Sequence, residues 1–401
     1  MNILNTGKFF MIFMIFIILS SIFTITFPLN LYPDYLSSQY SYNDTVWAVF
    51  LKSNSLLFDN KVSDTFLIFD YQLYLTPQIQ ILNIFSKIIP FSGYENCQII
   101  SVFDKLQFLF ITILFITLLI LIDNCIKNKS NKSNKSNLIF VSSLFFPITL
   151  TSITIPSAEA IYSIIIMFIF SRVFDKNISL GNYLFLLCLL IYAYFLDSGN
   201  WIVSFLFLLN IIIMKILIEF NKKLFFIIFT IIVFGIIFFS NEFINLLDTV
   251  YQSNKLKSVL YDIEQNGADK KNLFDLISRY LYFWLTLAGI LTSNKMFMIL
   301  NFLYIISGFC FVIHIIVKKK VIINNIINNN FYIIIILNII FFPLIIISLL
   351  PLHAFGKYYI FMIPLILSFL SFYIEIRKLL LFIVLSSIIF MLNVQFLYIK
   401  I

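Results

Sequence analysis

The sequence predicts an all-α fold, a polytopic membrane helix bundle of about 11 transmembrane helices that forms a single membrane domain over residues 1–401. Three observations predict this class. The composition is 61% hydrophobic and only 11% charged, with 50 phenylalanines, which is unlike a soluble domain. Several uncharged runs of 17 to 22 residues can cross a hydrocarbon core as helices, whereas membrane strands would alternate apolar and polar residues. Finally, lysine and arginine are concentrated in alternate loops.

The first predicted span, 9–27, follows Lys8 and is similar in outline to a signal peptide. No small-x-small cleavage site closes it and the apolar run is too long, so we expect an uncleaved helix. The polar repeat "NKSNKSNKSN" at 128–137 predicts a solvated loop. The other predicted spans are 106–122, 138–155, 158–174, 180–196, 201–220, 224–240, 296–317, 331–350, 358–374 and 379–398.

The orientation follows from the basic residues. With the N-terminus inside, the inner loops hold 15 Lys and Arg against four acids, Asp123, Asp175, Glu219 and Glu375. The remaining 12 basic and 15 acidic residues lie outside, so the net charge of +8 reflects topology and no nucleic-acid partner is predicted. The predicted location is a bacterial inner (plasma) membrane, with the N-terminus in the cytoplasm.

Two long loops then face outward, 28–105 and 241–295. In the first, the pattern predicts a helix that begins after Thr76 and stops at Pro90, too short to span and apolar on one face. Such a helix should lie in the membrane interface. Residues 280–295 are also apolar but short, and the aromatic Trp284 there favours an interfacial or re-entrant segment.

Ionisable residues collect on this outer side, although charges are almost absent from the span centres, where each would cost roughly 2.5–3.5 kcal/mol on insertion scales. Their convergence from separate segments predicts a functional rim. Its candidate members are Asp34, Asp44, Glu159, Asp197, Glu242, Asp248, His353 and Lys357, with Arg279 from the second long loop.

Each candidate also has a purely structural interpretation. Glu159 can interact with the amino-terminal dipole of the fourth span. Asp34 can form a turn after proline, and Asp44 can cap a helix. His353 can simply lie in a solvated loop, and Lys357 can be a snorkelling lysine. The sequence leaves these alternatives open.

Several classes of chemistry lack a motif here. The four cysteines imply no disulfide or metal pairing, and the sequence contains no phosphate-binding glycine motif and no HExxH helix. A divalent metal could assist a reaction, but the sequence does not demand one. A substrate that keeps its tail in lipid while its head reaches the outer rim fits this arrangement, and a polyprenyl-phosphate sugar is such an amphiphile.

The architecture resembles that of the GT-C fold glycosyltransferases, membrane enzymes that use polyprenyl-phosphate sugar donors. The stretch "YNDTVWAVFLKSNSLLF" (42–58) looks like the family's acidic helix, and "YLTPQIQILNIFSKIIP" (74–90) looks like its second interfacial helix. The stretch at 144–172 is similar to its third and fourth spans. "LLPLHAFGKYYIFMIPLI" (349–366) is similar to a late loop that commonly carries an arginine-tyrosine pair.

The resemblance implies roles for the candidate residues. Asp44, or Asp34 in its place, would be the general base toward an acceptor hydroxyl of a lipid-linked or glycan acceptor. Glu159 would position the acceptor or a sugar hydroxyl, and His353, Lys357 and Arg279 would neutralise the lipid phosphate. Lys357 stands where the family has arginine, and a lysine offers one point charge in place of a planar fork.

Two other functions compete with this one. An O-antigen or capsule repeat-unit polymerase shares the length, the span number and the lipid-linked substrate, but those enzymes commonly use outward arginines, and only Arg279 lies outside here. A lipid-linked oligosaccharide flippase or another transporter is the second alternative. Transporters usually carry ionisable groups at mid-depth or broken helices, and the sequence predicts neither.

Overall fold

The computed structural model describes residues 3–26, 102–126, 134–154, 158–172, 179–196, 198–239, 273–287, 330–349, 356–371 and 374–398. Over these ranges the chain is all-α, as predicted, and contains no strand. Two compact units are present, one formed by Met1–Ile202 with Ile360–Ile401 and the other by Val203–Tyr359. Each unit buries apolar side chains of its own, and the expectation of a single membrane domain stays a prediction.

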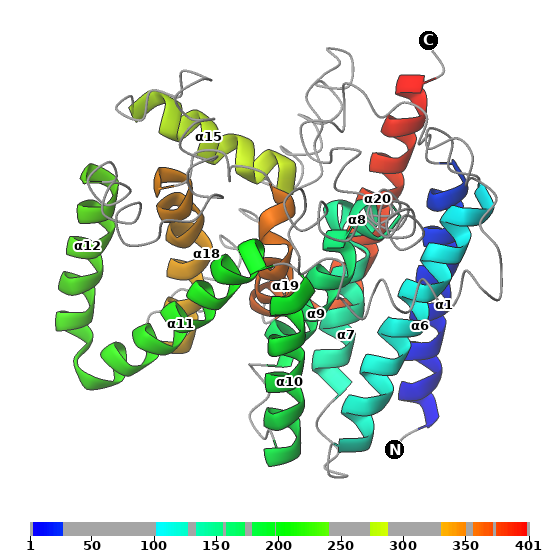
Figure 1. The fold of residues 1–401 in the computed structure, drawn as a ribbon, viewed down its shortest axis with the longest axis horizontal. Coiled ribbons are helices and arrows are strands. Elements are labelled where there is room, and N and C mark those ends of the chain that lie inside the picture. The colour runs from blue at the N-terminus through cyan, green and yellow to red at the C-terminus, as the bar shows by residue number, and fades with distance from the viewer. Residues whose placement is uncertain are drawn as a thin grey trace, which may run out of the picture. The chain divides into compact units, whose positions relative to one another are not determined.

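Most of the described helices belong to the first unit, and Figure 1 labels them. Helix α9 lies at its centre, since every side chain from Ala160 to Arg172 is buried. It packs against α7, α8, α10 and α19, as expected for a helix that is apolar on all sides. The helices of this unit are α1 (Ile3–Thr26), α6 (Val102–Ile126), α7 (Asn134–Leu144), α8 (Pro147–Thr154), α9 (Ala158–Arg172), α10 (Leu180–Leu196), α19 (Ile363–Leu370) and α20 (Ile376–Tyr398).

The predicted span 138–155 is wrong as one continuous helix. The chain breaks at Phe145 and Phe146, where α7 ends and Pro147 begins α8. Proline lacks an N–H and its ring disfavours the helical conformation of the preceding residue, so it weakens the helical hydrogen bonding at this point. The hydroxyl of Ser387 in α20 donates to the carbonyl of Phe145 at the break, and a neighbouring helix thereby satisfies a backbone group.

The predicted span 358–374 also needs correction. The chain forms a 3-10 helix, η4 (Gly356–Met362), before the short α19 begins, and α19 ends at Leu370. Tyr359 has non-helical dihedral angles within η4, and Pro364 lies in the first turn of α19. A proline suits the first turn of a new helix, where its missing N–H would have no partner within the helix.

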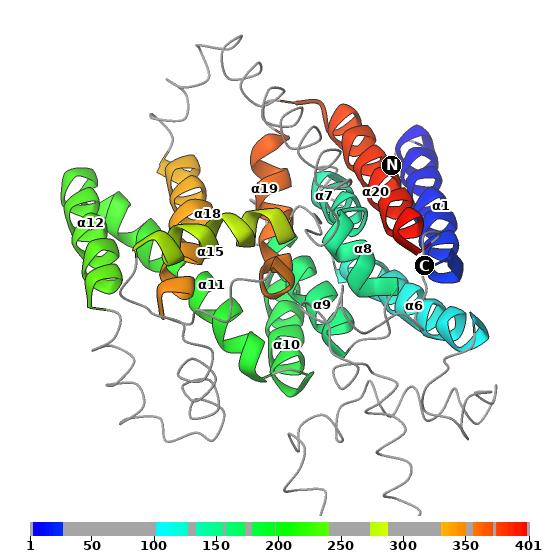
Figure 2. The same cartoon turned by 90° about the horizontal axis from the view of Figure 1, so that it is seen from above.

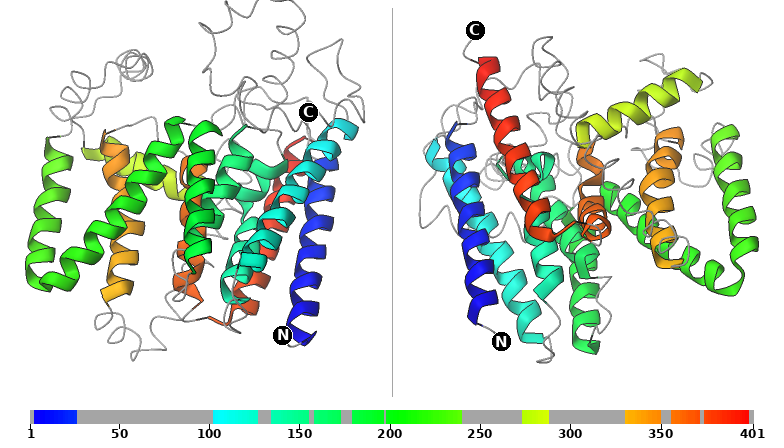
Figure 3. Two further views of the ribbon diagram at one scale, coloured as in Figure 1. Left: turned by 60° about the horizontal axis from the view of Figure 1, so that its bottom comes forward. Right: turned by 180° about the vertical axis from the view of Figure 1, so that it is seen from behind.

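The second unit contains the rest of α11 (Ser198–Phe220), together with α12 (Lys222–Phe238), α15 (Leu273–Leu287), α18 (Asn330–Leu349) and the start of η4. Asn221 forms the corner between α11 and α12, where its side-chain oxygen accepts from the backbone N–H groups of Lys223 and Leu224 at 3.0 and 3.1 Å. Helices α12 and α18 pack together, whereas α15 runs across α18 (Figures 2 and 3).

Among the residues that the structure describes, two helices are long and apolar enough to cross a membrane, judged by length and composition alone. These stretches are Leu109–Ile126 in α6 and Asn200–Phe220 in α11. Other described helices carry shorter apolar stretches, and α10 spans the predicted residues 180–196. The predicted span 296–317 lies outside the described residues, so the predicted number of about 11 spans stays a prediction.

A polar contact joins α11 to α18 inside the second unit. The amide nitrogen of Asn210 donates to the side-chain oxygen of Asn338 at 2.6 Å. The Asn338 amide in turn donates to the carbonyl of Ile334 at 2.8 Å, and Asn338 is fully buried. An asparagine pair of this kind holds helices together where the surroundings are apolar.

Replacing Asn338 with leucine is expected to cost about 0.5–2 kcal/mol of unfolding free energy, because the Asn210 amide then loses its acceptor. Denaturant unfolding in detergent, followed by circular dichroism, measures this change. The double variant N210L/N338L should lose little more than N338L alone. Strictly additive losses would contradict the interhelical contact.

Candidate functional site

The structure describes only some of the residues of the predicted functional rim. Asp34, Asp44 and His353 lie outside the described residues, as do Asp197, Glu242 and Asp248, so the roles given to them stay predictions. Glu159 lies in the first turn of α9, which begins at Ala158. A carboxylate at this position suits the amino-terminal end of the helix dipole, and a substrate-facing role is equally compatible with it.

Arg279 and Lys357 belong to two segments that the second unit brings together. The last turn of α15 and the start of η4 meet where the backbone N–H of Gly356 donates to the hydroxyl of Thr286 at 2.8 Å. The Thr286 hydroxyl itself donates to the carbonyl of Phe283 at 3.0 Å. We call this contact region, formed by Phe283, Thr286, Leu287, Gly356 and Tyr359, the α15–η4 junction.

Glycine is required at position 356. A Cβ atom there would lie 2.3 Å from the backbone nitrogen of Leu287 and 2.4 Å from its Cα. Backbone atoms cannot move aside as a flexible side chain would, so the two segments approach this closely only because Gly356 has no side chain. Lys357 is the next residue along the chain, and its backbone position is therefore set by the α15–η4 junction.

Aromatic rings extend the junction. Tyr359 is fully buried and its ring packs edge-on against Phe283, with centroids 4.7 Å apart. Tyr280 and Trp284 continue this aromatic group along α15. The Tyr280 hydroxyl donates to the carbonyl of Ile340 in α18 at 2.7 Å. Burial raises the pKa of Tyr280, so the phenol keeps its proton at neutral pH and remains a donor.

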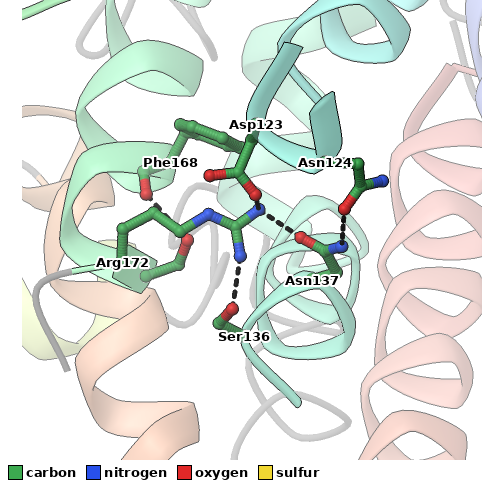
Figure 4. A network of polar contacts seen from close by, with 7 residues as sticks. Asp123, Asn124, Ser136, Asn137, Phe168 and Arg172 are labelled. Atoms are coloured by element: carbon green, nitrogen blue, oxygen red, sulfur yellow. Dashed lines mark hydrogen bonds and ion pairs between the residues drawn. The ribbon is translucent and has the colours of Figure 1, made fainter. Parts of the chain in front are cut away.

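A second polar site lies in the first unit, and the sequence pattern did not predict it. Arg172, at the end of α9, forms an ion pair with Asp123 of α6, with a nitrogen–oxygen distance of 2.9 Å (Figure 4). Arg172 is 2% exposed and Asp123 is 1% exposed. Among the residues that the structure describes, these are the only charged side chains that are buried.

The guanidinium reaches a third helix as well. It donates to the Ser136 hydroxyl and to the side-chain oxygen of Asn137, both at the start of α7. The Asn137 amide then donates to the side-chain oxygen of Asn124 at 3.2 Å. The guanidinium carbon lies 4.5 Å from the centroid of Phe168. We call Asp123, Asn124, Ser136, Asn137, Phe168 and Arg172 the Arg172 cluster.

The positions of these residues explain why the sequence did not reveal the cluster. Asp123 and Arg172 each end an apolar run and are followed by lysines, a pattern that predicts solvated inner loops for both. Their burial as a pair corrects that prediction. The sequence does contain a signal for this pair. One acid and one arginine lie at the ends of two predicted spans, on the same predicted side of the membrane. Arginine is also rare on that side, because every other basic residue there except Arg377 is a lysine.

The described residues contain no group of three or more His, Cys, Asp or Glu side chains that could hold a metal ion. Comparisons with known proteins gave no match, whether against protein-family models, curated proteins or solved structures.

Proposed function

We propose that this chain is an integral membrane glycosyltransferase that moves a sugar from a polyprenyl-phosphate carrier to an acceptor at the outer face of the membrane, in cell-surface polysaccharide assembly. Asp34 or Asp44 would be the general base, and Glu159 would position the acceptor. Lys357, Arg279 and His353 would neutralise the phosphate of the departing carrier.

The membrane placement is supported by large apolar side chains that are exposed in the described part of the chain. Helix α10 buries one face, while Leu180, Leu184, Leu187 and Ile191 on its other face are at least half exposed. Helix α12 is similar, with Ile227, Ile231, Phe234 and Phe238 exposed. Faces this apolar are stable in a hydrocarbon solvent and would be a liability in water.

The observation that carries the proposal is the α15–η4 junction. Helix α15 runs across α18 (Figure 1), and its 15 residues are too few to span the bilayer. Its Tyr280 and Trp284 belong to the residue types found at headgroup depth. This helix carries Arg279 and holds the segment that begins with Gly356 and Lys357. Basic residues on two segments that are joined in this way suit the phosphate of a lipid-linked donor.

Reconstitution in liposomes with a set of radiolabelled polyprenyl-phosphate sugars tests this function. We expect transfer by the unmodified protein and a loss of at least about 100-fold in the double variant D34N/D44N, because a general base contributes that much to the rate. The matched control is D175N, which removes an acid from a predicted inner loop. Undiminished transfer by the double variant would exclude both general bases.

A transporter of lipid-linked oligosaccharides is the second candidate, because one observation favours it. The chain is broken between α7 and α8 at Pro147, and broken helices are common in transporters. In the same liposomes, passage of a fluorescent lipid-linked oligosaccharide across the bilayer separates the two functions. Flux that persists in D34N/D44N, without sugar transfer by the unmodified protein, would favour the transporter and reject the enzyme.

A further inference from the structure

One face of α15 carries the residues that meet η4. Phe283 and Thr286 both contact this segment, through the Tyr359 ring and the Gly356 N–H respectively. Arg279 precedes them by four and seven residues, so the three form a single stripe along the helix. Ile277 and Leu281, off this stripe, are exposed. Arg279 therefore continues the face of α15 that holds the start of η4.

Thr286 has a particular place on this stripe. It is 1% exposed, and its hydroxyl uses both of its capacities, donating to Phe283 and accepting from Gly356. The second bond connects residues that are 70 positions apart in the chain. This hydroxyl is thus a side-chain tie between the helix that carries Arg279 and the segment that carries Lys357.

We propose that Thr286 is a positioning residue for the carrier phosphate. Its hydroxyl holds the backbone beside Lys357 against the face of α15 that carries Arg279, Phe283 and Thr286. This inference rests on the proposed function, for which Arg279 and Lys357 neutralise the phosphate of the polyprenyl carrier. It names the group recognised at the α15–η4 junction, a phosphate monoester or diester at headgroup depth, and the residue that sets the geometry.

The chemistry of lysine makes such a tie important. A guanidinium imposes direction through its planar fork, whereas an ammonium is a point charge on a flexible stem. The position of a lysine charge depends on where its backbone is held. Lys357 therefore gains more from a fixed backbone at Gly356 than an arginine at the same position would.

Binding of radiolabelled polyprenyl phosphate to the full-length protein in nanodiscs tests the inference, independently of transfer. We expect T286V to weaken binding about tenfold, as for the loss of one hydrogen bond that orients a charged group. T286S keeps the hydroxyl and should bind within about twofold of the unmodified protein. The control is T230V, since Thr230 is exposed on α12 and its hydroxyl donates to the carbonyl of Phe226 in its own helix.

A second variant guards against a fold defect in T286V. Arg279 is only partly buried, so R279Q should keep its helicity and melting temperature and still weaken binding about tenfold. The double variant T286V/R279Q should lose less than the product of the two single losses, because the tie matters less once Arg279 is gone. A merely structural threonine would give independent losses.

The outcomes separate the two proposals. Unchanged binding by T286V or by R279Q overturns the positioning role, whether or not the protein transfers sugar. Binding that depends on Thr286, in a protein that transfers from none of the donors, supports the positioning role and rejects the glycosyltransferase. No binding by the unmodified protein rejects both.

Discussion

Replacing Arg172 with methionine is expected to cost about 3–5 kcal/mol of unfolding free energy, more than any other substitution proposed for this chain. The change leaves the buried carboxylate of Asp123 without the cation that faces it at 2.9 Å. It also removes the donors to Ser136 and Asn137, so contacts of α9 with both α6 and α7 are lost together. Denaturant unfolding in detergent, followed by circular dichroism, measures the effect.

A matched surface pair provides the control. Lys378 lies 3.8 Å from Glu375, and the two side chains are 70% and 73% exposed. K378M should change the unfolding free energy by less than about 1 kcal/mol, because water screens an exposed pair. The double variant D123L/R172M should recover part of the R172M loss, since it no longer buries an uncompensated charge. Equal losses for R172M and K378M would show that the Arg172 cluster is not buried as described.

Replacing Gly356 with alanine is the second large change. The new methyl group would lie 2.3 Å from the backbone nitrogen of Leu287, so the α15–η4 junction must separate. We expect a loss of about 1–3 kcal/mol, as for an overpacked core, together with weaker binding of polyprenyl phosphate. Thermal unfolding measures the first effect and the nanodisc binding assay measures the second.

Two other glycines serve as controls, because the space around them differs from that around Gly356. A Cβ at Gly235 would meet nothing within 4 Å, so G235A in the interior of α12 should be stabilising by about 0.5–1 kcal/mol. A Cβ at Gly181 would lie 2.9 Å from a methyl carbon of Ile126, a side chain that can shift, so G181A should fall between the two. A melting temperature for G356A as high as that of G235A would contradict the close approach.

Much of the secondary structure could be predicted from the sequence, because uncharged runs of sufficient length leave few alternatives to a helix. The predicted stretch 180–196 and the observed α10 have the same ends, and α18 differs from the predicted 331–350 by one residue at each end. Residues 280–287 of the predicted segment 280–295 belong to α15, which begins earlier, at Leu273. Its interfacial location stays a prediction.

The errors arose where local rules and apolar length disagreed. Pro147 is evident in the sequence, but an apolar run that continues through a proline can be either a kinked helix or two helices. The structure has two, and the tie from Ser387 that supports the break comes from a distant helix. The start of η4 is likewise held by the contact between Gly356 and Thr286, which no local sequence pattern reveals.

The candidate site was predictable only as a set of residue types. Arg279 and Lys357 were predicted to share a role, and the structure places their segments against each other. The pairing of Asp123 with Arg172 could not be predicted, because it depends on how α6 and α9 meet and each residue alone is typical of a loop. The general base, Asp34 or Asp44, stays a prediction.

The Arg172 cluster also bears on how the chain is made. Ribosomes deliver Asp123 first, then Ser136, and Arg172 only 36 residues after Ser136. Until α9 is synthesised, the carboxylate lacks the guanidinium that pairs with it in the folded chain. The contact that joins α6, α7 and α9 can therefore form only after residue 172 has been made, which makes it a late step of folding.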